Sequence, residues 1–446
     1  MKILLLSPVQ DPDARIPKAV RIPQVSLDLL RALTPAEHEV RIVEEETEPI
    51  NLDEDCDLVG ISCMTASAPR AYEMAGEFRR RGKKVVIGGI HPTILPDEAS
   101  WHADAVVVGE AESIWATVLG DAANGTLAKR YDGPAGDLAD FPIIDLARDQ
   151  RKSFVNLTPV MTTKGCPYSC DFCCVNAIYG SRMRHIPIPT VVESIRRSGR
   201  KSFLFLDDNI IGRKSYAREL FQSLIPLNIR WVGQASISFA DDGELMQLAA
   251  RSGCYGLFVG LESVAPDTLS TMIKTRSPKL SFEAIEKMHD AGIIFHASVV
   301  FGFDTDDERV FDNTLEFLLK AKVHSASINI LTPYPGTRLH ARLEEEGRLL
   351  TKDWRKYNHG TVVFRPKQMT AECLEENQLR VRKEFYALSS ILRRLPNNMS
   401  NPLVYLGMNA ALRSTMKTDR RALAKKREIR AEAGFRGAEA GTDPLP

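Results

Sequence analysis

The sequence predicts an α/β protein with an N-terminal doubly wound parallel sheet, a partial (β/α)6 barrel and a helical C-terminal region. Two observations support this fold class. Short apolar stretches alternate with stretches of helical periodicity before about residue 125, and the alternation returns between residues 159 and 340. Strands separated by helical segments are typical of a parallel sheet with helices packed on it. From residue 341 to residue 446 the patterns are mainly helical.

The composition is that of an ordinary globular protein, with 44% hydrophobic and 26% charged residues among 446. Lys plus Arg equals Asp plus Glu, 58 each, so the net charge gives no reason to expect a nucleic-acid partner. The opening "MKILLLSPVQD" has too short an apolar run for a signal peptide, and no stretch approaches the ~20 apolar residues that span a bilayer. We therefore expect a cytoplasmic protein that binds no nucleic acid.

The N-terminal segment, residues 1–125, is expected to bind a ligand at one edge of its sheet, because ligands of parallel sheets collect beyond the carboxyl ends of the strands. Three strand-end loops, "SCMTASAP", "GGIHPTILP" and "VGEAES", contain small residues that let a backbone approach a ligand closely. Strands are expected at residues 2–7, 39–44, 57–63, 84–89 and 103–110, and helices at residues 25–33, 69–82 and 111–121.

Residues 126–158 are predicted to be a connector, since they are rich in Gly, Pro and Asp and show no sustained period. The barrel is expected in residues 159–340, with polar residues at the ends of five strands, where such folds build their sites. The barrel strands are expected within residues 158–163, 201–209, 229–236, 255–263, 293–304 and 325–336. The polar strand-end residues are Asp207, Asp208, Asn209, Gln234, Ser236, Glu262, Ser263, Asp304 and Thr332.

The stretch "TTKGCPYSCDFCCV" holds four of the eight cysteines, spaced Cys166-x3-Cys170-x2-Cys173 with Cys174 adjacent. A disulfide knot would need an oxidising compartment, and a zinc site usually uses two separated ligand pairs. Thiolates at short spacings within one loop are typical of an iron–sulfur cluster. The other four cysteines are scattered, so three close thiolates without an evident fourth suggest a cluster with one open iron.

The loop "CPYSCDFC" resembles the CxxxCxxC motif of radical S-adenosylmethionine (SAM) enzymes. The resemblance implies that Cys166, Cys170 and Cys173 hold a [4Fe–4S] cluster and that SAM chelates the fourth iron. Cys174 is the alternative third ligand, but the family spacing favours Cys173. "LDDN" stands where the family has a GGE motif and lacks its glycines. The residues implied to contact SAM are Phe172, Asp207, Asp208, Gln234, Ser236, Glu262, Ser263, Arg276 and Ser298, with Lys274 as the alternative to Arg276.

The segments "GGIHPTILPDEA" and "ADAVVVGEAE" resemble the cobalamin-binding domain that precedes the barrel in one subgroup of this family. The DxHxxG signature, which supplies a histidine to the cobalt, is absent, so we expect no such ligand from this motif. The alternative is that the domain has lost its cofactor. The residues expected to contact cobalamin are Thr65, Gly89, Ile90, His91, Pro92, Thr93, Gly109 and Glu110.

The resemblance implies an enzyme that reduces and cleaves SAM at the cluster to form a 5′-deoxyadenosyl radical. Cobalamin-dependent methylation of an unactivated carbon is the favoured reaction. Radical cyclisation or rearrangement without methyl transfer is the alternative, and a non-catalytic cobalamin or iron–sulfur sensor is the non-enzymatic one. The implied partners are a small-molecule or lipid-like substrate and an external electron donor such as flavodoxin or ferredoxin.

The C-terminal region, residues 341–446, contains the apolar "NPLVYLGMNAALRSTMK" followed by the basic "RRALAKKREIR". Charged segments of this kind are usually solvated helices or tails. Because apolar residues precede basic ones, peripheral contact with a membrane is the alternative. The final "GAEAGTDPLP" is predicted to be disordered.

Overall fold

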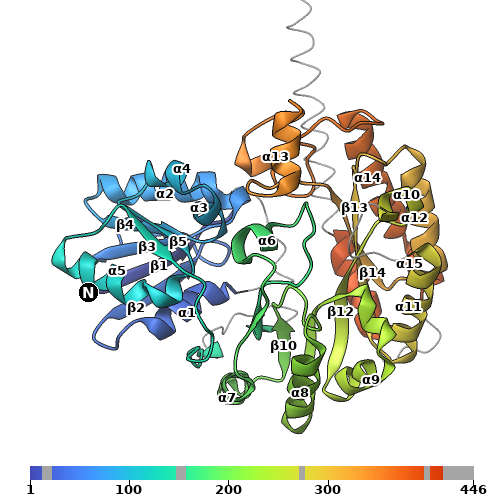
Figure 1. The fold of residues 1–446 in the computed structure, drawn as a ribbon, viewed down its shortest axis with the longest axis horizontal. Helices are drawn as coiled ribbons and strands as arrows, with labels where there is room; N and C mark the ends of the chain where they lie inside the picture. Colours follow the sequence, from blue (N-terminus) through green and yellow to red (C-terminus); the bar gives the residue numbers. More distant parts are fainter. Residues whose placement is uncertain (13–22, 147–156, 271–276, 396–401, 415–446) are drawn as a thin grey trace, which may run out of the picture.

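The computed structural model describes residues 1–12, 23–146, 157–270, 277–395 and 402–414. Two six-stranded sheets lie next to each other, and every strand pair within them is parallel (Figure 1). The predicted disordered tail and the basic segment before it lie outside the described residues. No described helix combines the length and apolar character that crossing a membrane requires.

The N-terminal sheet has the strand order β2-β1-β3-β4-β5-β6 and helices on both faces, which confirms the predicted doubly wound architecture. On one face α2 buries Met74 and Phe78, and on the other α5 buries Trp115 and Leu119. The strands are β1 (Lys2–Ser7), β2 (Glu39–Glu44), β3 (Leu58–Ser62), β4 (Lys84–Gly88), β5 (Ala105–Gly109) and β6 (Arg130–Gly133). The helices are α1 (Val25–Leu33), α2 (Ala68–Arg80), α3 (Ile90–Ile94), α4 (Pro96–Ser100) and α5 (Trp115–Asn124).

The sixth strand, β6, lies inside the stretch 126–158 that was expected to be a connector. Its four residues, Arg130–Gly133, alternate exposed and buried side chains, but such a short run with two charges carries too weak a period to stand out in the sequence. Gly133 packs so closely on the backbone of Glu110 that a Cβ would lie 1.9 Å from its carbonyl oxygen. The N-terminal sheet therefore extends past residue 125.

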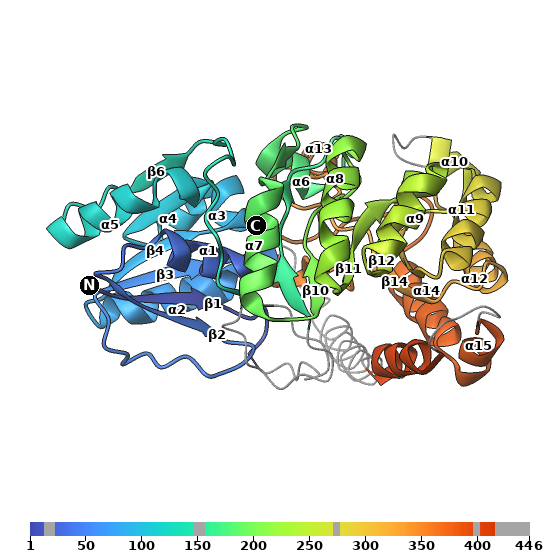
Figure 2. The same ribbon diagram turned by 90° about the horizontal axis from the view of Figure 1, so that it is seen from below.

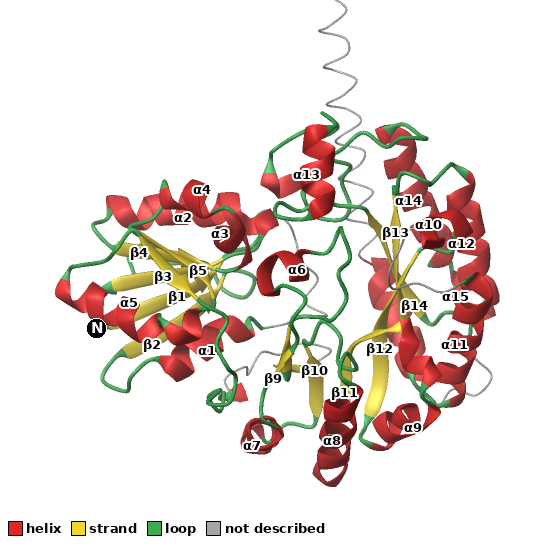
Figure 3. Cartoon of the chain, viewed as in Figure 1, coloured by secondary structure: helices red, strands yellow, loops and turns green. Residues whose placement is uncertain are grey.

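The second sheet has the order β14-β13-β12-β11-β10-β7, so the first and last strands lie at opposite edges and the predicted partial (β/α)6 barrel is confirmed as open. Helices cover its outer face (Figure 3). The strands are β7 (Thr158–Val160), β10 (Ser202–Phe205), β11 (Arg230–Ser236), β12 (Cys254–Glu262), β13 (Ile294–Phe301) and β14 (Ser325–Ile330). The helices are α6 (Cys174–Tyr179), α7 (Ile188–Ser198), α8 (Lys214–Leu224), α9 (Gly243–Arg251), α10 (Pro266–Ser270), α11 (Pro278–Asp290) and α12 (Arg309–Lys320).

The C-terminal region is helical, as predicted, and is fixed to the barrel by buried polar contacts. The Tyr386 hydroxyl donates to the Ala326 carbonyl (2.7 Å) on β14. Arg394 is fully buried, donates to the Val323 carbonyl (2.6 Å) and lies over the ring of Phe385. The elements are α13 (Arg338–Glu345), the 3-10 turn η6 (Trp354–Lys356), α14 (Ala371–Phe385), α15 (Leu388–Arg393) and a helical segment over residues 402–414.

Candidate functional site

The cysteine loop is closed at its base by a short antiparallel ribbon. Strand β8 (Thr163–Lys164) pairs with β9 (Arg184–His185), so the loop leaves and returns at the same place. Gly165 turns the chain into the loop with a φ of 87°, and a Cβ there would lie 2.5 Å from the Arg182 carbonyl oxygen. Only glycine tolerates this close approach. The pairing of β8 with β9 then holds both ends of the loop together. In Figure 1 the loop's helix, α6, lies between the two sheets.

Three cysteines of this loop suit a [4Fe–4S] cluster. Cys166 is buried, Cys170 and Cys173 are half-buried, and none of the eight cysteines, all in described parts of the chain, forms a disulfide. Cys174 is the first residue of α6, and burial raises the pKa of its thiol to about 12. The described residues contain no group of three or more His, Cys, Asp or Glu that could hold a single metal ion. A four-iron cluster needs none, because each thiolate binds a different iron.

The segment "LDDN" after β10 fixes the stem of this loop. Asp207 is fully buried, and its Oδ1 accepts hydrogen bonds from the hydroxyls of Thr162 (2.8 Å) and Thr163 (2.6 Å). Its Oδ2 has no partner among the described residues, and burial raises the pKa of the carboxyl. Asn209 Oδ1 accepts from the backbone N–H of Ser236 (3.1 Å). Asp207 therefore holds the strand that enters the cysteine loop, and Asn209 holds the end of β11.

Asp208, the middle residue of this segment, lies toward the loop. Burial raises the pKa of the Tyr179 hydroxyl on α6, and the nearby Asp208 carboxylate raises it further. The same carboxylate acts on the Cys174 thiol. Asp208 is only partly buried, so of the two aspartates it is the one whose side chain can reach a ligand near the cysteine loop.

Two rows of mainly polar residues cross one face of the second sheet. The register aligns Ser236 with Gly260, Ser298 and Ser327, and one pleat below it aligns Gln234 with Phe258, His296 and Ser325. The row between them, on the opposite face, is Ala235, Val259, Ala297 and Ala326, all buried. Since side chains alternate across a strand, the barrel has an apolar outer face and a polar inner face. The inner face ends at the cysteine loop, where Ser238 bridges Ser236 (2.7 Å) and Tyr168 (3.4 Å).

Glu262 stands at the end of this inner face in a strained conformation. Its φ is 60°, which is uncommon for a residue other than glycine. A Cβ on Gly260 would lie 2.4 Å from Oε1 of Glu262, so the carboxylate folds back over the inner face. Non-glycine residues held in this way cluster at ligand sites. The next residue, Ser263, is buried, and its hydroxyl accepts from the Ala265 N–H (3.1 Å).

The predicted SAM residues thus fall into distinct settings. Ser236, Ser298, Gln234 and Glu262 belong to the inner face, while Asp207 is enclosed. Phe172, beside Cys173, packs edge-on against Phe303 with ring centres 5.9 Å apart. Arg276 and its alternative Lys274 lie outside the described residues. A direct contact between any of these residues and SAM remains a prediction.

The predicted cobalamin rim lies at the carboxyl edge of the N-terminal sheet, where its glycines serve close packing. Gly89 has a φ of 103°, and a Cβ there would lie 2.7 Å from the carbonyl oxygen of Cys63. The Thr93 hydroxyl donates to the Gly89 carbonyl (2.8 Å) and accepts from the Gly109 N–H (3.0 Å). Thr65 and Pro92 are buried, whereas Ile90, Thr93 and the two glycines are partly exposed. Contacts of these residues with cobalamin remain predictions.

Met64 provides an apolar surface on this rim. Its side chain is 54% exposed at the end of β3, next to Thr65. Together with the half-buried Ile90 it can support one face of a flat macrocycle, so the rim is compatible with cobalamin. The strand-end loop "SCMTASAP", which contains Met64, was predicted to lie at the ligand-binding edge of the sheet, but the exposure of Met64 was not predicted.

His91, also predicted at this rim, is fully buried behind it. Its Nε2 lies 3.1 Å from Glu98 Oε1, and its Nδ1 has no partner among the described residues. Glu98 also accepts from the Trp354 indole (3.0 Å) and the Tyr72 hydroxyl (3.1 Å). Burial raises the pKa of Glu98, but these hydrogen bonds outweigh it and lower the pKa overall. Because Trp354 belongs to η6, this node joins the C-terminal region to the N-terminal sheet.

Glu110 joins the N-terminal rim to the base of the cysteine loop. It is 8% exposed and pairs with Arg184 of β9 (Nη1–Oε2 3.0 Å) and with Lys164 of β8 (3.4 Å). Lys164 also pairs with Glu112, and Arg184 donates to the Gly136 carbonyl (2.7 Å). Burial raises the pKa of Glu110, but both cations outweigh it and lower the pKa overall. This interdomain ion cluster sets two carboxylates against two cations, which balances the buried charge.

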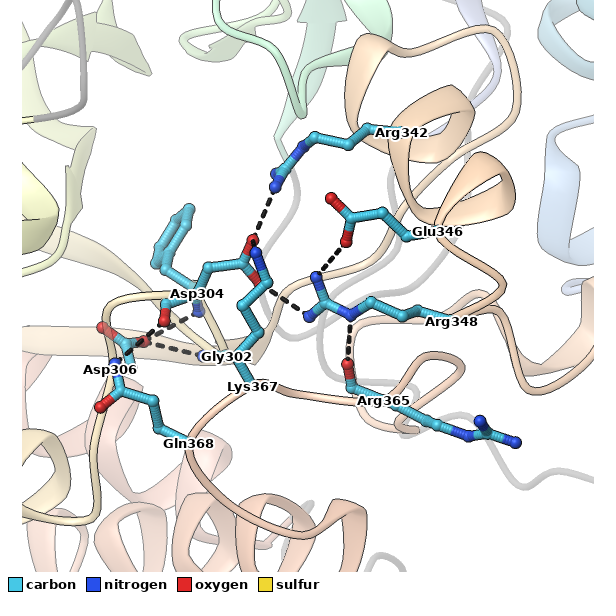
Figure 4. A network of polar contacts seen from close by, with 10 residues as sticks. Gly302, Asp304, Asp306, Arg342, Glu346, Arg348, Arg365, Lys367 and Gln368 are labelled. Atoms are coloured by element: carbon cyan, nitrogen blue, oxygen red, sulfur yellow. Dashed lines mark hydrogen bonds and ion pairs between the residues drawn. The ribbon is translucent and has the colours of Figure 1, made fainter.

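A second ion network fixes the loop after β13 to the C-terminal region (Figure 4). Asp304 accepts from Arg342 (2.6 Å) and Arg348 (2.7 Å) and pairs with Lys367 (3.3 Å). Burial raises the pKa of Asp304, but these cations outweigh it and hold the pKa at about 2. Asp306, in the same loop, caps it by accepting from the backbone N–H of Gly302 (2.9 Å). Asp304 thus ties a strand-end loop of the barrel to three cations of the C-terminal region.

Sequence comparisons identify both halves of the chain. The family model described as the B12 binding domain matches residues 21–119, and the Radical SAM superfamily model matches residues 160–318. The bacteriochlorophyllide d C-12(1)-methyltransferase of Chlorobaculum tepidum is 34% identical over 77% of this chain and 78% of its own. The bacteriochlorophyllide d C-8(2)-methyltransferase of the same organism is 30% identical over 88% of this chain and 92% of its own.

The fold is that of a solved methyltransferase. The radical SAM methyltransferase TsrM of Kitasatospora setae, solved with its tryptophan substrate and a SAM analogue, aligns with a TM-score of 0.68. At 16% sequence identity, the alignment covers 96% of this chain and 99% of that one. The parallel N-terminal sheet, the open barrel with its cysteine loop and the two family matches agree, and the chain belongs to the radical SAM enzymes that carry an N-terminal cobalamin-binding domain.

Proposed function

We propose that this enzyme transfers a methyl group to an unactivated carbon of a small apolar ring compound. The observation that carries the proposal is the position of the cysteine loop. The loop ends the polar inner face of the barrel, and the interdomain ion cluster fixes its base to the rim of the N-terminal sheet. A methyl donor on that rim and a radical generator on the loop would therefore work on one substrate between them.

When bound, the cluster and SAM would supply a radical that removes a hydrogen atom from the substrate carbon and leaves as 5′-deoxyadenosine, and methylated cobalamin would supply the methyl group. In this proposal Cys166, Cys170 and Cys173 hold the cluster. The inner face, with Ser236, Ser298 and Glu262, orients SAM. Met64 and Ile90 support the corrin. Helices cover the outer face of the sheet, and Trp354 of η6 ties the C-terminal region to Glu98 of α4 beside the N-terminal sheet.

A bacteriochlorophyllide-type tetrapyrrole is the first substrate to test. Two relatives named for that substrate are 34% and 30% identical to this chain over most of its length. A hopanoid-type lipid is the second, since a relative named hopanoid C-2 methylase is 25% identical over 87% of the chain. The proposal includes an external one-electron donor such as flavodoxin or ferredoxin, a cytoplasmic location that keeps the thiols reduced, and peripheral contact with a membrane.

Anaerobic turnover of the reconstituted, reduced protein with SAM tests the reaction. Methyl transfer should yield both 5′-deoxyadenosine and S-adenosylhomocysteine, and omission of cobalamin should abolish the second product. Formation of 5′-deoxyadenosine alone, with substrate converted but not methylated, would favour cyclisation or rearrangement. If neither product forms, a non-catalytic sensor is the explanation that remains. Methyl-labelled SAM followed by mass spectrometry of the tetrapyrrole would identify the methylated carbon.

A further inference from the structure

Exposed apolar side chains are concentrated in one part of the C-terminal region. The described residues include ten large hydrophobic side chains that are well exposed, and five of them lie between residues 388 and 406. Their exposed fractions reach 65% for Leu388, 66% for Leu392 and 77% for Leu403. Single exposed leucines are normal on a protein surface, but a group of them marks an interaction site. These five residues, the C-terminal apolar face, are Leu388, Leu392, Leu403, Val404 and Leu406.

The face is formed by two neighbouring helical segments. The Tyr405 hydroxyl donates to the Ile391 carbonyl (2.7 Å), and Asn409 lies 3.3 Å from the guanidinium of Arg394. Figure 2 shows α15 and residues 402–414 at one end of the molecule. Tyr405 and Asn409, four positions apart, are fully buried on one side of residues 402–414 against α15, so Leu403, Val404 and Leu406, one or two positions from Tyr405, lie on its other sides and are exposed. The face therefore stands away from the barrel.

The outward side of residues 402–414 carries no charge. Arg413 is the one charged residue in this segment, and it donates to the Tyr386 carbonyl (2.5 Å). The exposed residues of the segment are Pro402, Leu403, Val404, Leu406, Ala410 and Ser414. An exposed helix of a protein that stays in water normally carries charged residues on its outer side. This segment instead resembles the apolar side of a helix that docks on another surface.

The sequence that follows this uncharged segment is strongly basic. Residues 415–430 contain seven Lys and Arg against two acidic residues, in a chain whose overall net charge is zero. An apolar helical face followed by clustered basic residues is typical of binding to an anionic lipid surface. A symmetric dimer through the same face would bring two such basic segments together, and their repulsion disfavours it. The positive charge that follows the face in the sequence therefore favours an anionic membrane, rather than a second copy of the chain, as its partner.

We propose that the C-terminal apolar face docks on an anionic membrane surface, and that the net positive charge of residues 415–430, which follow it in the sequence, strengthens the binding. This inference deepens the membrane contact included in the proposed function and names the residues that make it. Leu403 and Leu406 enter the boundary between headgroups and acyl chains, and the basic residues later in the sequence add electrostatic attraction to anionic headgroups.

Co-sedimentation of the full-length protein with lipid vesicles tests the proposal, and it needs neither cofactor nor substrate. Vesicles of phosphatidylcholine with phosphatidylglycerol should bind the protein, and vesicles of phosphatidylcholine alone should bind it about tenfold less. The double substitution Leu403→Glu/Leu406→Glu should lower binding to the anionic vesicles about tenfold. Matched controls are Leu280→Glu and Leu350→Glu, each at a leucine that is 45% exposed elsewhere on the surface. Thermal unfolding should verify that every variant is folded.

Three outcomes would overturn the proposal: no binding to anionic vesicles, equal loss of binding in the two control variants, or a dimer in sedimentation velocity that the double substitution dissociates. The last result would assign the face to a second copy of this chain. Substitution of Lys425, Lys426 and Arg427 by glutamine should weaken binding further, and unchanged binding would contradict the role of the basic residues. Each failure leaves methyl transfer untouched, because turnover is measured separately.

Discussion

The two six-stranded parallel sheets differ in the surface that each offers to a ligand. The N-terminal sheet is covered on both faces, by cores that include Phe78 on one side and Trp115 on the other, so only its carboxyl edge remains. The barrel sheet is covered on one face, and its other face carries rows of polar residues around Ser298 and His296. Parallel strands alone therefore do not decide where a ligand binds. The position of the ligand site depends on how many faces of the sheet are covered.

The largest expected effect concerns the loop that belongs to the barrel face. Cys166→Ala, Cys170→Ala and Cys173→Ala should each abolish the [4Fe–4S] cluster, because each thiolate binds its own iron. Cys174→Ala should retain it, since burial raises the pKa of the Cys174 thiol to about 12 and disfavours the thiolate that would bind iron. Iron and sulfide analysis after anaerobic reconstitution measures the outcome. Full iron content in all three single variants would remove the basis for assigning the cluster to this loop.

A smaller effect is expected where the two sheets are joined. Glu110→Gln leaves Lys164 and Arg184 buried with one carboxylate fewer, and breaking a buried ion pair costs about 3–5 kcal/mol of unfolding free energy. Urea unfolding of the apoprotein measures it. The matched control is Glu193→Gln, which breaks exposed pairs with Arg196 and Arg197 on α7 and should change stability little. Equal losses of unfolding free energy in both variants would show that the buried interdomain ion pairs stabilise the protein no more than exposed pairs do.

A substitution at the N-terminal edge should act on cobalamin and spare the barrel. Gly89→Ala places a methyl group 2.7 Å from the Cys63 backbone at a φ of 103°, which costs about 1–3 kcal/mol of unfolding free energy. Hydroxocobalamin binding should weaken while the visible spectrum of the iron–sulfur cluster persists. Gly76→Ala in α2, where nothing lies within 4 Å, is the control and should stabilise the protein slightly. Loss of both cofactors together would mean that the two sheets do not respond independently.

The smallest expected effect is at the outer network around Asp304, and it depends on pH. The folded-state pKa of about 2 lies below the value in the unfolded chain, so this carboxylate stabilises the protein above about pH 4 and the stabilisation is lost as the pH falls toward 2. After allowance for solvent screening, Asp304→Asn should cost about 1 kcal/mol of unfolding free energy at pH 7. The difference from wild type should shrink at pH 3. A difference that stays constant with pH would exclude an electrostatic origin.

The sequence was sufficient for every strand of the two sheets except β6, because the other strands are apolar runs bounded by loops, and β1, α1 and β2 occupy the expected residues. The four-residue strand β6 has no such run, so its pairing with β5 depends on the folded sheet. The strand-end residues were found, but not their neighbours Phe258 and Ser327, which a two-residue alternation could have revealed. Sequence alone also could not show that Glu110 meets Lys164 and Arg184, since 54 and 74 positions separate them.

The interdomain ion cluster also has a consequence for the order of assembly. Synthesis proceeds from the N-terminus, and the first sheet is complete with Gly133, 33 positions before Cys166 appears. Glu110 and Glu112 are therefore already placed when Lys164 and Arg184 leave the ribosome. The loop can close onto a finished docking platform before iron arrives. Maturation then fills a loop whose two ends are already anchored.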